Sequence, residues 1–272
     1  MKNQLFTLLM CILSFSCATN PFTGKKTMAF MPNSQLLPMA FAEYDKFLSE
    51  NKVIKETSDA EMISRVGQRI SVAAERWLDA NNHQGYLKDY EWEYNLVEDE
   101  SVNAWCMPGG KIVFYTGILP VAKNEAGIAA IMGHEVAHAL ANHGQQRMSA
   151  GMIQQGVGAG VAIATKDKTK SEQDLWMQAF AVGSSVGGML PFSRSHETEA
   201  DEIGLYLTAI AGYNPDEASL LWERMKANSE GKSPPEFLST HPSNDSRISN
   251  LRALAGKAKE EARKFGVTTF RQ

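Results

Sequence analysis

Apolar residues recur at intervals of three and four in residues 33–82, a period that predicts helix over most of this stretch. The period then changes to two in "EWEYNLVED", where Trp92, Tyr94 and Leu96 alternate with charged residues and predict a half-buried strand. A Pro-Gly-Gly turn follows and leads into a second predicted strand, Lys111–Thr116.

Helical spacing returns in residues 124–143, with Gly144 as the residue expected to stop the helix. Further helices are predicted at about 195–211, from about 214 onwards, and from 245 to about 264. The expected fold class is therefore α+β, mostly helical, with a small β-sheet beside the helix of residues 124–143.

Residues 150–190 have an unusual composition. Two Gly/Ala-rich apolar stretches, "AGMIQQGVGAGVAIAT" and "LWMQAFAVGSSVGGML", flank the polar "KDKTKSEQD". Each is shorter than the roughly 18 residues that a membrane span needs. We expect a helical hairpin packed closely through its small residues. Contact with a membrane surface and a mobile flap are the alternatives.

Composition and charge exclude one class of partner. The chain has 272 residues, of which 43% are hydrophobic and 21% charged, enough to build a sizeable core. The net charge is −4, the isoelectric point is near 5.9, and no block of basic residues occurs. We therefore expect no nucleic acid partner.

Residues 1–16 predict a signal peptide, because a positive residue precedes an apolar stretch too short to span a bilayer. Cys17 follows directly after a small residue, which resembles a loose bacterial lipobox, in which the cysteine becomes the lipidated first residue of the mature chain. A secretory signal cut near residues 16–19 is the alternative. Both interpretations predict export. The first predicts a periplasmic lipoprotein anchored in the outer membrane, with residues 17–32 as its tether.

The stretch "GHEVAHALANHG" holds three of the six histidines. His134 and His138 are four residues apart, so a helix places both imidazoles on one face, where they can bind one Zn²⁺. Glu135 is rotated by about 100° from His134 and would lie beside the metal as a general base. His143 lies about 140° from His138 and is not expected to be a ligand. A third ligand is needed to make this pattern specific.

The candidate third ligand lies in "SRSHETEADEIG", where Glu197 and Asp201 share one helix face and Gly204 allows close packing. Glu197 would complete a His₂Glu set that leaves one zinc position open, as catalytic sites do. Asp201 is placed to orient a ligating histidine. The alternative is a solvated acidic helix face that includes Glu199. His196 points away from Glu197 and is not expected to be a ligand.

"HEVAH" followed by "ETEAD" at this separation resembles the gluzincin zinc metallopeptidases of the HtpX and CAAX prenyl protease type. "VNAWCMPGGKIVFYTGIL", "GYNPDEA" and "THPSNDSRI" add to the resemblance, which covers roughly residues 33–255. The long hydrophobic spans of the integral-membrane members are absent, so the match is closest to the exported branch with BepA and LoiP. The resemblance implies a zincin-like metallopeptidase domain at 33–255, followed by the end of a C-terminal helix and a tail at 256–272.

The resemblance also implies roles for individual residues. One zinc ion per chain would be bound by His134, His138 and Glu197, with Glu135 as the base and Asp201 supporting a ligand.

A histidine in the downstream loop "THP" is a further candidate. In relatives this residue, His241 here, can approach the zinc and close the open position, or assist the transition state. A histidine that only anchors its loop is the alternative. Arg247 is expected to stabilise that region or the developing oxyanion.

Substrate binding is expected at a strand edge. The strand Lys111–Thr116 is predicted to pair with an extended substrate backbone, which makes Lys111 and Val113 candidate substrate-binding residues. Asn103 and Ala104 would lie in the same substrate-facing segment. Such pairing favours unfolded or extended polypeptide as the partner.

The leading hypothesis is an exported zinc endopeptidase that hydrolyses misfolded or stalled envelope proteins in protein quality control. The alternative is a chaperone-like binding protein of the same family whose site is held shut by His241. A prenyl-peptide protease is disfavoured, because this chain cannot build a membrane-spanning chamber. The sequence leaves the oligomeric state open.

Overall fold

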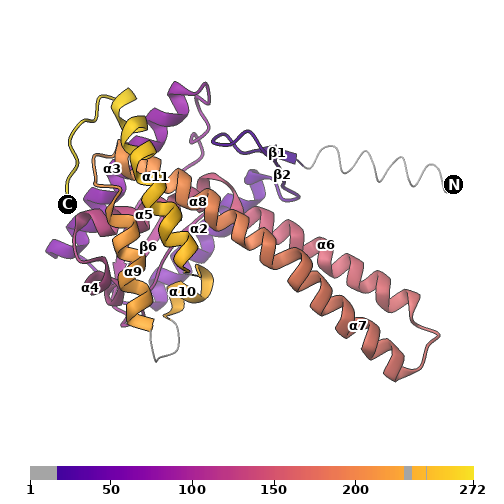
Figure 1. Cartoon of the computed structure of the whole chain (residues 1–272). Coiled ribbons are helices and arrows are strands. Elements are labelled where there is room, and N and C mark those ends of the chain that lie inside the picture. The colour runs from indigo at the N-terminus through magenta and orange to yellow at the C-terminus, as the bar shows by residue number, and fades with distance from the viewer. Residues whose placement is uncertain (1–16, 230–234, 243) are drawn as a thin grey trace. The chain divides into compact units, whose positions relative to one another are not determined.

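The computed structural model describes residues 17–229, 235–242 and 244–272, and these fall into two compact units (Figure 1). The body consists of Ser34–Ala141 and Thr198–Gln272. The hairpin unit consists of Asn142–Glu197 and the N-terminal segment up to Asn33. The predicted signal peptide lies outside the described residues.

The body carries most of the helices and one sheet (Figure 1). Its helices are α2 (Asn33–Glu50), α3 (Ser58–Ala80), η1 (Thr116–Ile118), α4 (Leu119–Ala122), α5 (Glu125–Leu140), the C-terminal part of α8 (Leu190–Ile210), α9 (Glu217–Ser229), α10 (Glu236–Thr240) and α11 (Asp245–Lys264). Its strands are β3 (Val53–Ile54), β4 (Glu93–Val97), β5 (Ala104–Met107) and β6 (Lys111–Tyr115). The predicted α+β class, mostly helical with a small sheet, is confirmed.

The sheet has the order β3-β4-β6-β5, with β4 and β6 parallel and the other two pairs antiparallel. The prediction that Lys111–Thr116 forms a free edge is wrong, because β6 is hydrogen-bonded to β4 on one side and to β5 on the other. Every residue of β6 is therefore occupied in pairing. The edge on this side of the sheet is β5, which packs against α5.

The burial of its side chains accounts for the central position of β6 in the sheet. Its residues from Lys111 to Phe114 are all buried, and Val113 packs with Tyr44 and Val97 in one apolar cluster. The Lys111 ammonium lies over the ring of Phe41 at 4.8 Å, which stabilises the cation within the packed interior.

The helix α5 ends earlier than the sequence predicts. Asn124 accepts a hydrogen bond from the Gly127 N–H and caps its start, but the helix stops at Leu140. Asn142 then adopts a left-handed conformation with φ of 57°, which asparagine tolerates better than most residues, and α6 begins at His143. The predicted end at residue 143 and the predicted stop at Gly144 are therefore wrong.

Two glycines bring α5 and α8 into close contact. A Cβ atom on Gly133 would lie 2.6 Å from the Gly204 carbonyl oxygen, and one on Gly204 would lie 2.8 Å from the His134 backbone nitrogen. Only glycine fits at either position. The close approach predicted at Gly204 is confirmed, and it sets the spacing between the two helices that carry the candidate site.

The hairpin unit contains a two-stranded ribbon, β1 (Cys17–Thr19) and β2 (Lys26–Met28), within the predicted tether. Its helices are α6 (His143–Ala164), α7 (Lys170–Ser184), the π-helical η2 (Ser185–Met189) and the first part of α8. Since α6 and α7 pack along each other, the predicted helical hairpin is confirmed. None of the described helices is sufficiently long and apolar to cross a membrane.

The C-terminal region is tied to the body. The helix α11 runs without a break past residue 255, and Ala255, Ala258 and Ala262 are buried along one face. The tail is held by Arg271, whose backbone N–H donates to the Gly212 carbonyl oxygen at 2.9 Å.

Candidate metal site

The helix α5 presents His134 and His138 on one face, as their spacing predicts. Both side chains are buried, and their Nε2 atoms lie 3.1 Å apart. The helix is buried around most of its circumference and is made of small and branched apolar residues. The two imidazoles are therefore the main polar groups on this face, and both aim at one point.

Four side chains share this point. Glu197 stands on α8, one residue before the part of the helix that belongs to the body. One ligand atom each from His134, His138, Glu197 and His241 lies within 4.8 Å of the other three, and all four side chains are buried. Three imidazoles and one carboxylate form a donor set of the kind that binds Zn²⁺.

The Nδ1 atom of His134 faces the Oδ1 atom of Asp201 at 3.1 Å. A proton on Nδ1 is favoured by this contact, and it leaves the Nε2 lone pair of His134 directed at the shared point. The residues present therefore fit a zinc ion, since the supporting carboxylate fixes the tautomer that a metal needs.

Asp201 is itself held by Arg247. The guanidinium donates from Nε at 2.7 Å and from Nη2 at 2.8 Å to the two carboxylate oxygens. Burial alone would raise the pKa of Asp201, but the charge of Arg247 and the hydrogen bond to His134 hold it below its ordinary value. Asp201 is therefore an anion that strengthens the basicity of His134.

Arg247 also contacts the segment that carries His241. It donates from Nη1 to the Pro242 carbonyl oxygen at 3.1 Å, and its guanidinium carbon lies 3.7 Å from the centre of the Trp222 ring. The buried Arg247 guanidinium thus contacts Asp201, the Trp222 ring and the loop that carries His241.

Glu135 lies in contact with His241, whose Nε2 atom is 3.4 Å from a carboxylate oxygen of Glu135. The side chain of Glu135 is buried beside the four candidate ligands, where the motif places a general base. On β5, burial and the charge of Glu135 raise the pKa of the Cys106 thiol well above its ordinary value. The edge strand and the candidate base are therefore near neighbours.

His143 and His196 lie outside the cluster of four candidate ligands, although the angle predicted for His143 does not apply, because His143 begins α6 and is not on the helix of His138. Both are buried in the hairpin unit, where their rings stack with centroids 4.1 Å apart. His196 also pairs with the Gln146 side-chain oxygen at 3.1 Å. The alternative of a solvated acidic face on α8 is wrong, because Glu199 is buried, as are Glu197 and Asp201.

The predicted substrate residues lie in different surroundings. Val113 is fully buried and Lys111 is almost so, within the paired strand β6, and neither can offer a free backbone edge. The Asn103 side chain accepts a hydrogen bond from the Ala104 N–H at 2.9 Å, at the start of β5. Asn103 and Ala104 therefore border the edge strand, and Lys111 and Val113 are structural.

Two aromatic residues near the site were not predicted. Trp222 on α9 and Phe237 on α10 place their ring centres 6.0 Å and 6.5 Å from that of His134. Each stands among apolar residues that are typical of an ordinary core helix. Nothing in the sequence around Trp222 and Phe237 distinguishes an aromatic residue beside the candidate metal site from one in the hydrophobic core.

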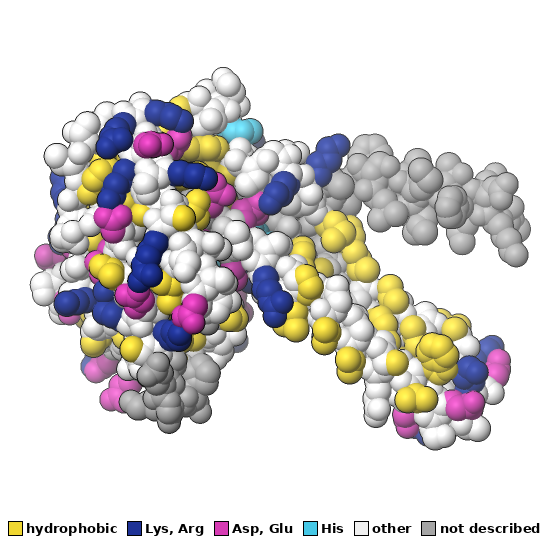
Figure 2. Space-filling view, viewed as in Figure 1, with side chains coloured by type: hydrophobic (Ala, Val, Ile, Leu, Met, Phe, Trp, Pro, Cys, Tyr) yellow, Lys and Arg dark blue, Asp and Glu magenta, His cyan; other side chains and the backbone are white. Residues whose placement is uncertain are grey.

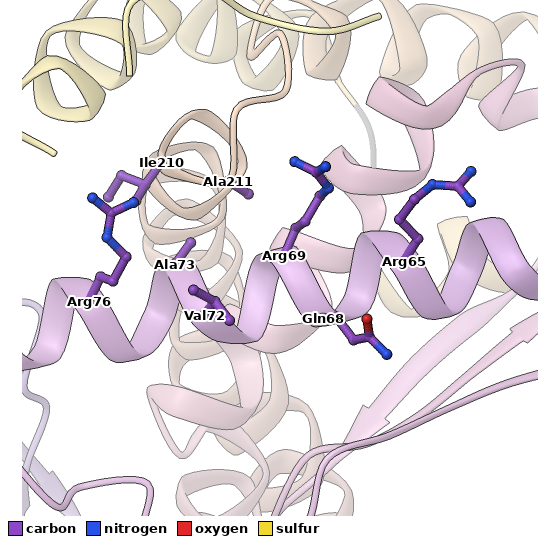
Figure 3. A pocket seen from close by; sticks show the side chains of 8 residues that line it. All are labelled: Arg65, Gln68, Arg69, Val72, Ala73, Arg76, Ile210 and Ala211. Atoms are coloured by element: carbon purple, nitrogen blue, oxygen red, sulfur yellow. The ribbon is translucent and has the colours of Figure 1, made fainter. Parts of the chain in front are cut away.

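One cavity in the body is separate from this cluster. It has a volume of about 430 Å³ and is lined by α3 and the end of α8, with Arg65, Arg69 and Arg76 projecting from one side of α3 (Figure 3). None of the four candidate ligands lines it. Arg65 forms an ion pair with Glu125.

Residues 65–255 match the model of peptidase family M48. The chain is 39% identical over 167 residues to mitochondrial metalloendopeptidase OMA1 of Schizosaccharomyces pombe, which covers 61% of this chain and 47% of the relative. It is 34% identical over 205 residues to OMA1 of Saccharomyces cerevisiae, covering 73% and 56%. It is 26% identical over 175 residues to the beta-barrel assembly-enhancing protease of Escherichia coli, covering 61% and 35%. The chain thus spans about half the length of the two OMA1 relatives.

Proposed function

The chain belongs to peptidase family M48, and we propose that it is an endopeptidase that hydrolyses peptide bonds with one zinc ion bound by His134, His138 and Glu197. The observation that carries this proposal is the convergence of these three ligand atoms next to the Glu135 carboxylate. The relatives described above are all named as peptidases or proteases, so the expected alternative, a non-catalytic binding protein, finds no support.

Each residue around the zinc site has a separate task. Zinc supplies a Lewis acid that polarises the scissile carbonyl and acidifies water. Glu135 takes the proton from the attacking water and delivers it to the leaving amine. Asp201 holds His134 in the ligating tautomer, and Arg247 holds Asp201 in its charged form.

His241 is proposed to be a fourth protein ligand that would close the site. Its Nδ1 atom lies 3.2 Å from Nε2 of His134, among the candidate ligand atoms. A zinc site with four protein ligands has no open position, whereas a catalytic site keeps one open for water or substrate. We therefore propose that His241 restrains activity and leaves the site when substrate binds.

The substrate is proposed to be unfolded or extended polypeptide that pairs with β5. Within the described residues, β5 is hydrogen-bonded to a strand on one side only, and it packs on the helix that carries Glu135. An added strand would pair through the backbone, beginning near Asn103 and Ala104. This edge replaces the one first predicted on β6.

The location is proposed from the N-terminal sequence. Residues 1–16 and Cys17 favour an exported protein, lipidated at Cys17, that degrades misfolded or stalled proteins of the bacterial envelope. Labelling cells with a fatty-acid analogue tests the anchor. The intact chain should be labelled and Cys17→Ala should not; labelling of both would contradict the assignment.

The decisive experiment for the activity is Glu135→Gln. Because this change removes the base and keeps every ligand, we expect zinc content to stay equal and the hydrolysis of casein to fall by at least about 100-fold. Substrate trapping with the same variant should capture physiological targets. Unchanged hydrolysis in a zinc-loaded Glu135→Gln protein would rule out the proposed base.

A further inference from the structure

The α6–α7 hairpin exposes an unusual amount of apolar surface. Most of the exposed large hydrophobic side chains of the described residues lie on α6, on α7 and on the continuation of α7 through η2 to the start of α8. They are Met148, Met152, Ile153, Val157, Ile163, Leu175, Trp176, Met177, Val182, Val186 and Leu190. Figure 2 shows hydrophobic side chains along the hairpin and charged side chains gathered at its tip. Such a surface is larger than a protein in water ordinarily leaves uncovered.

The two arms are free of charge over matching lengths. Residues 148–165 and 175–193 contain no acidic, basic or histidine side chain. Arg147 and Arg194 flank the base of the hairpin, and the charged residues of the tip lie in 166–174. At 1.5 Å per residue each arm presents about 27 Å of charge-free helix.

The exposed apolar side chains also cover a wide face of each arm. At 100° per residue, those from Met148 to Ile163 spread over about 180° of α6, and those from Leu175 to Val182 over more than that around α7. A docked protein covers a stripe of about 100°. An exposed apolar face that covers half of the helix circumference or more is wider than such a stripe and fits contact with an apolar phase.

The contacts between the two arms are also of the kind found between helices in lipid. The side chain of Gln154, one of two adjacent glutamines on α6, donates to the Ser184 hydroxyl at 2.8 Å on the other arm. Gly158 leaves room for Phe180, whose ring carbon would lie 3.1 Å from a Cβ at that position. Small residues and polar pairs of this kind hold helices together in lipid.

The same unit contains the predicted lipidation site. The strand β1 begins at Cys17, and the Phe30 N–H donates to the Ser149 hydroxyl at 3.1 Å near the base of α6. A lipid on Cys17 would therefore hold the hairpin unit at a membrane.

We propose that the α6–α7 hairpin lies along the surface of a lipid bilayer, with the exposed apolar side chains of both arms against the apolar layer and the charged residues at both ends at the level of the headgroups. Trp176, next to the charged tip, lies where tryptophan is favoured at the boundary of a bilayer. The hairpin would hold the peptidase at the membrane independently of catalysis.

Vesicle flotation tests this proposal, using the full chain with Cys17→Ala so that no lipid anchor contributes. Vesicles of phosphatidylethanolamine and phosphatidylglycerol should carry this protein. Val157→Glu with Val182→Glu should lower the bound fraction by at least about tenfold, because each buried charge is costly in lipid. The matched control, Val72→Glu with Leu220→Glu, changes two exposed apolar residues of the body and should leave binding unchanged.

A second measurement does not depend on the folding of the charged variants. Vesicles with brominated acyl chains should quench tryptophan fluorescence of the Cys17→Ala protein, and Trp176→Phe should remove most of that quenching. Equal flotation of the hairpin variant and its control would overturn the proposal. So would a hairpin-dependent dimer in sedimentation that forms without vesicle binding, since the partner would then be a second copy. Neither readout requires peptide hydrolysis.

Discussion

Arg247 holds Asp201 through two hydrogen bonds, although 46 positions separate the two residues along the chain. Asp201 in turn faces Nδ1 of His134 at 3.1 Å, so a residue on α11 fixes the orientation of an imidazole on α5. The pair is buried, and replacing one partner leaves the other without its main counter-charge.

Loss of this support should weaken the binding of zinc. We expect Asp201→Asn to lower zinc affinity by about 10- to 100-fold, because the amide is a poorer acceptor for the His134 proton. Arg247→Met should also lower zinc affinity, because the Asp201 carboxylate would lose its counter-charge. Competition with a chromogenic chelator measures the affinity. If both variants bind zinc as tightly as the unchanged protein, the support of His134 has no energetic importance.

Glu197 and Glu199 provide a matched pair on one helix. Both are buried, but only Glu197 lies in the cluster of candidate ligands. Glu197→Gln should lose zinc and peptide hydrolysis together, since a neutral amide is a weak zinc ligand. Glu199→Gln should keep its zinc. Elemental analysis of the purified variants separates the two cases, and equal zinc loss in both would indicate general destabilisation of α8.

His241→Ala tests whether the loop histidine restrains the enzyme. Because its imidazole lies among the ligand atoms, its removal should open one zinc position and raise the rate of casein hydrolysis. Zinc should stay bound through the three remaining ligands. A fall in rate with zinc retained would assign His241 to catalysis instead.

The ligands were predictable because helix geometry fixes them locally. The spacing of four positions from His134 to His138 places both rings on one helix face whatever the rest of the chain does. The edge of the sheet was not predictable in this way, because local alternation does not tell whether a strand has one neighbour or two. The place of β6 between β4 and β5 depends on pairing between distant segments.

The position of His241 was likewise not predictable from local sequence pattern. Its approach to His134 spans 107 positions and depends on the packing of α10 and on the Arg247 contact with Pro242. The sequence supplied it only through family resemblance. The early end of α5 was missed for a different reason, since Asn142 is the residue that turns the chain and Gly144, the more common helix stop, lies two positions later.

The contact between Gly133 and Gly204 should be essential to the metal site, because it sets how closely α8 approaches α5. Gly204→Ala would place a methyl group 2.8 Å from the His134 backbone nitrogen, and the helices must separate to admit it. We expect the free energy of unfolding to fall by about 1–3 kcal/mol. Zinc affinity should fall as well, since the His134 backbone is displaced.

Gly256→Ala is the control for this change. Gly256 lies in α11 with no atom within 4 Å of an added Cβ, so the same substitution there should stabilise the body by about 0.5–1 kcal/mol through the helix backbone alone. Thermal unfolding with and without zinc measures both variants. A Gly204→Ala protein as stable and as tightly zinc-bound as the Gly256→Ala protein would show that the α5–α8 spacing can relax without cost to the site.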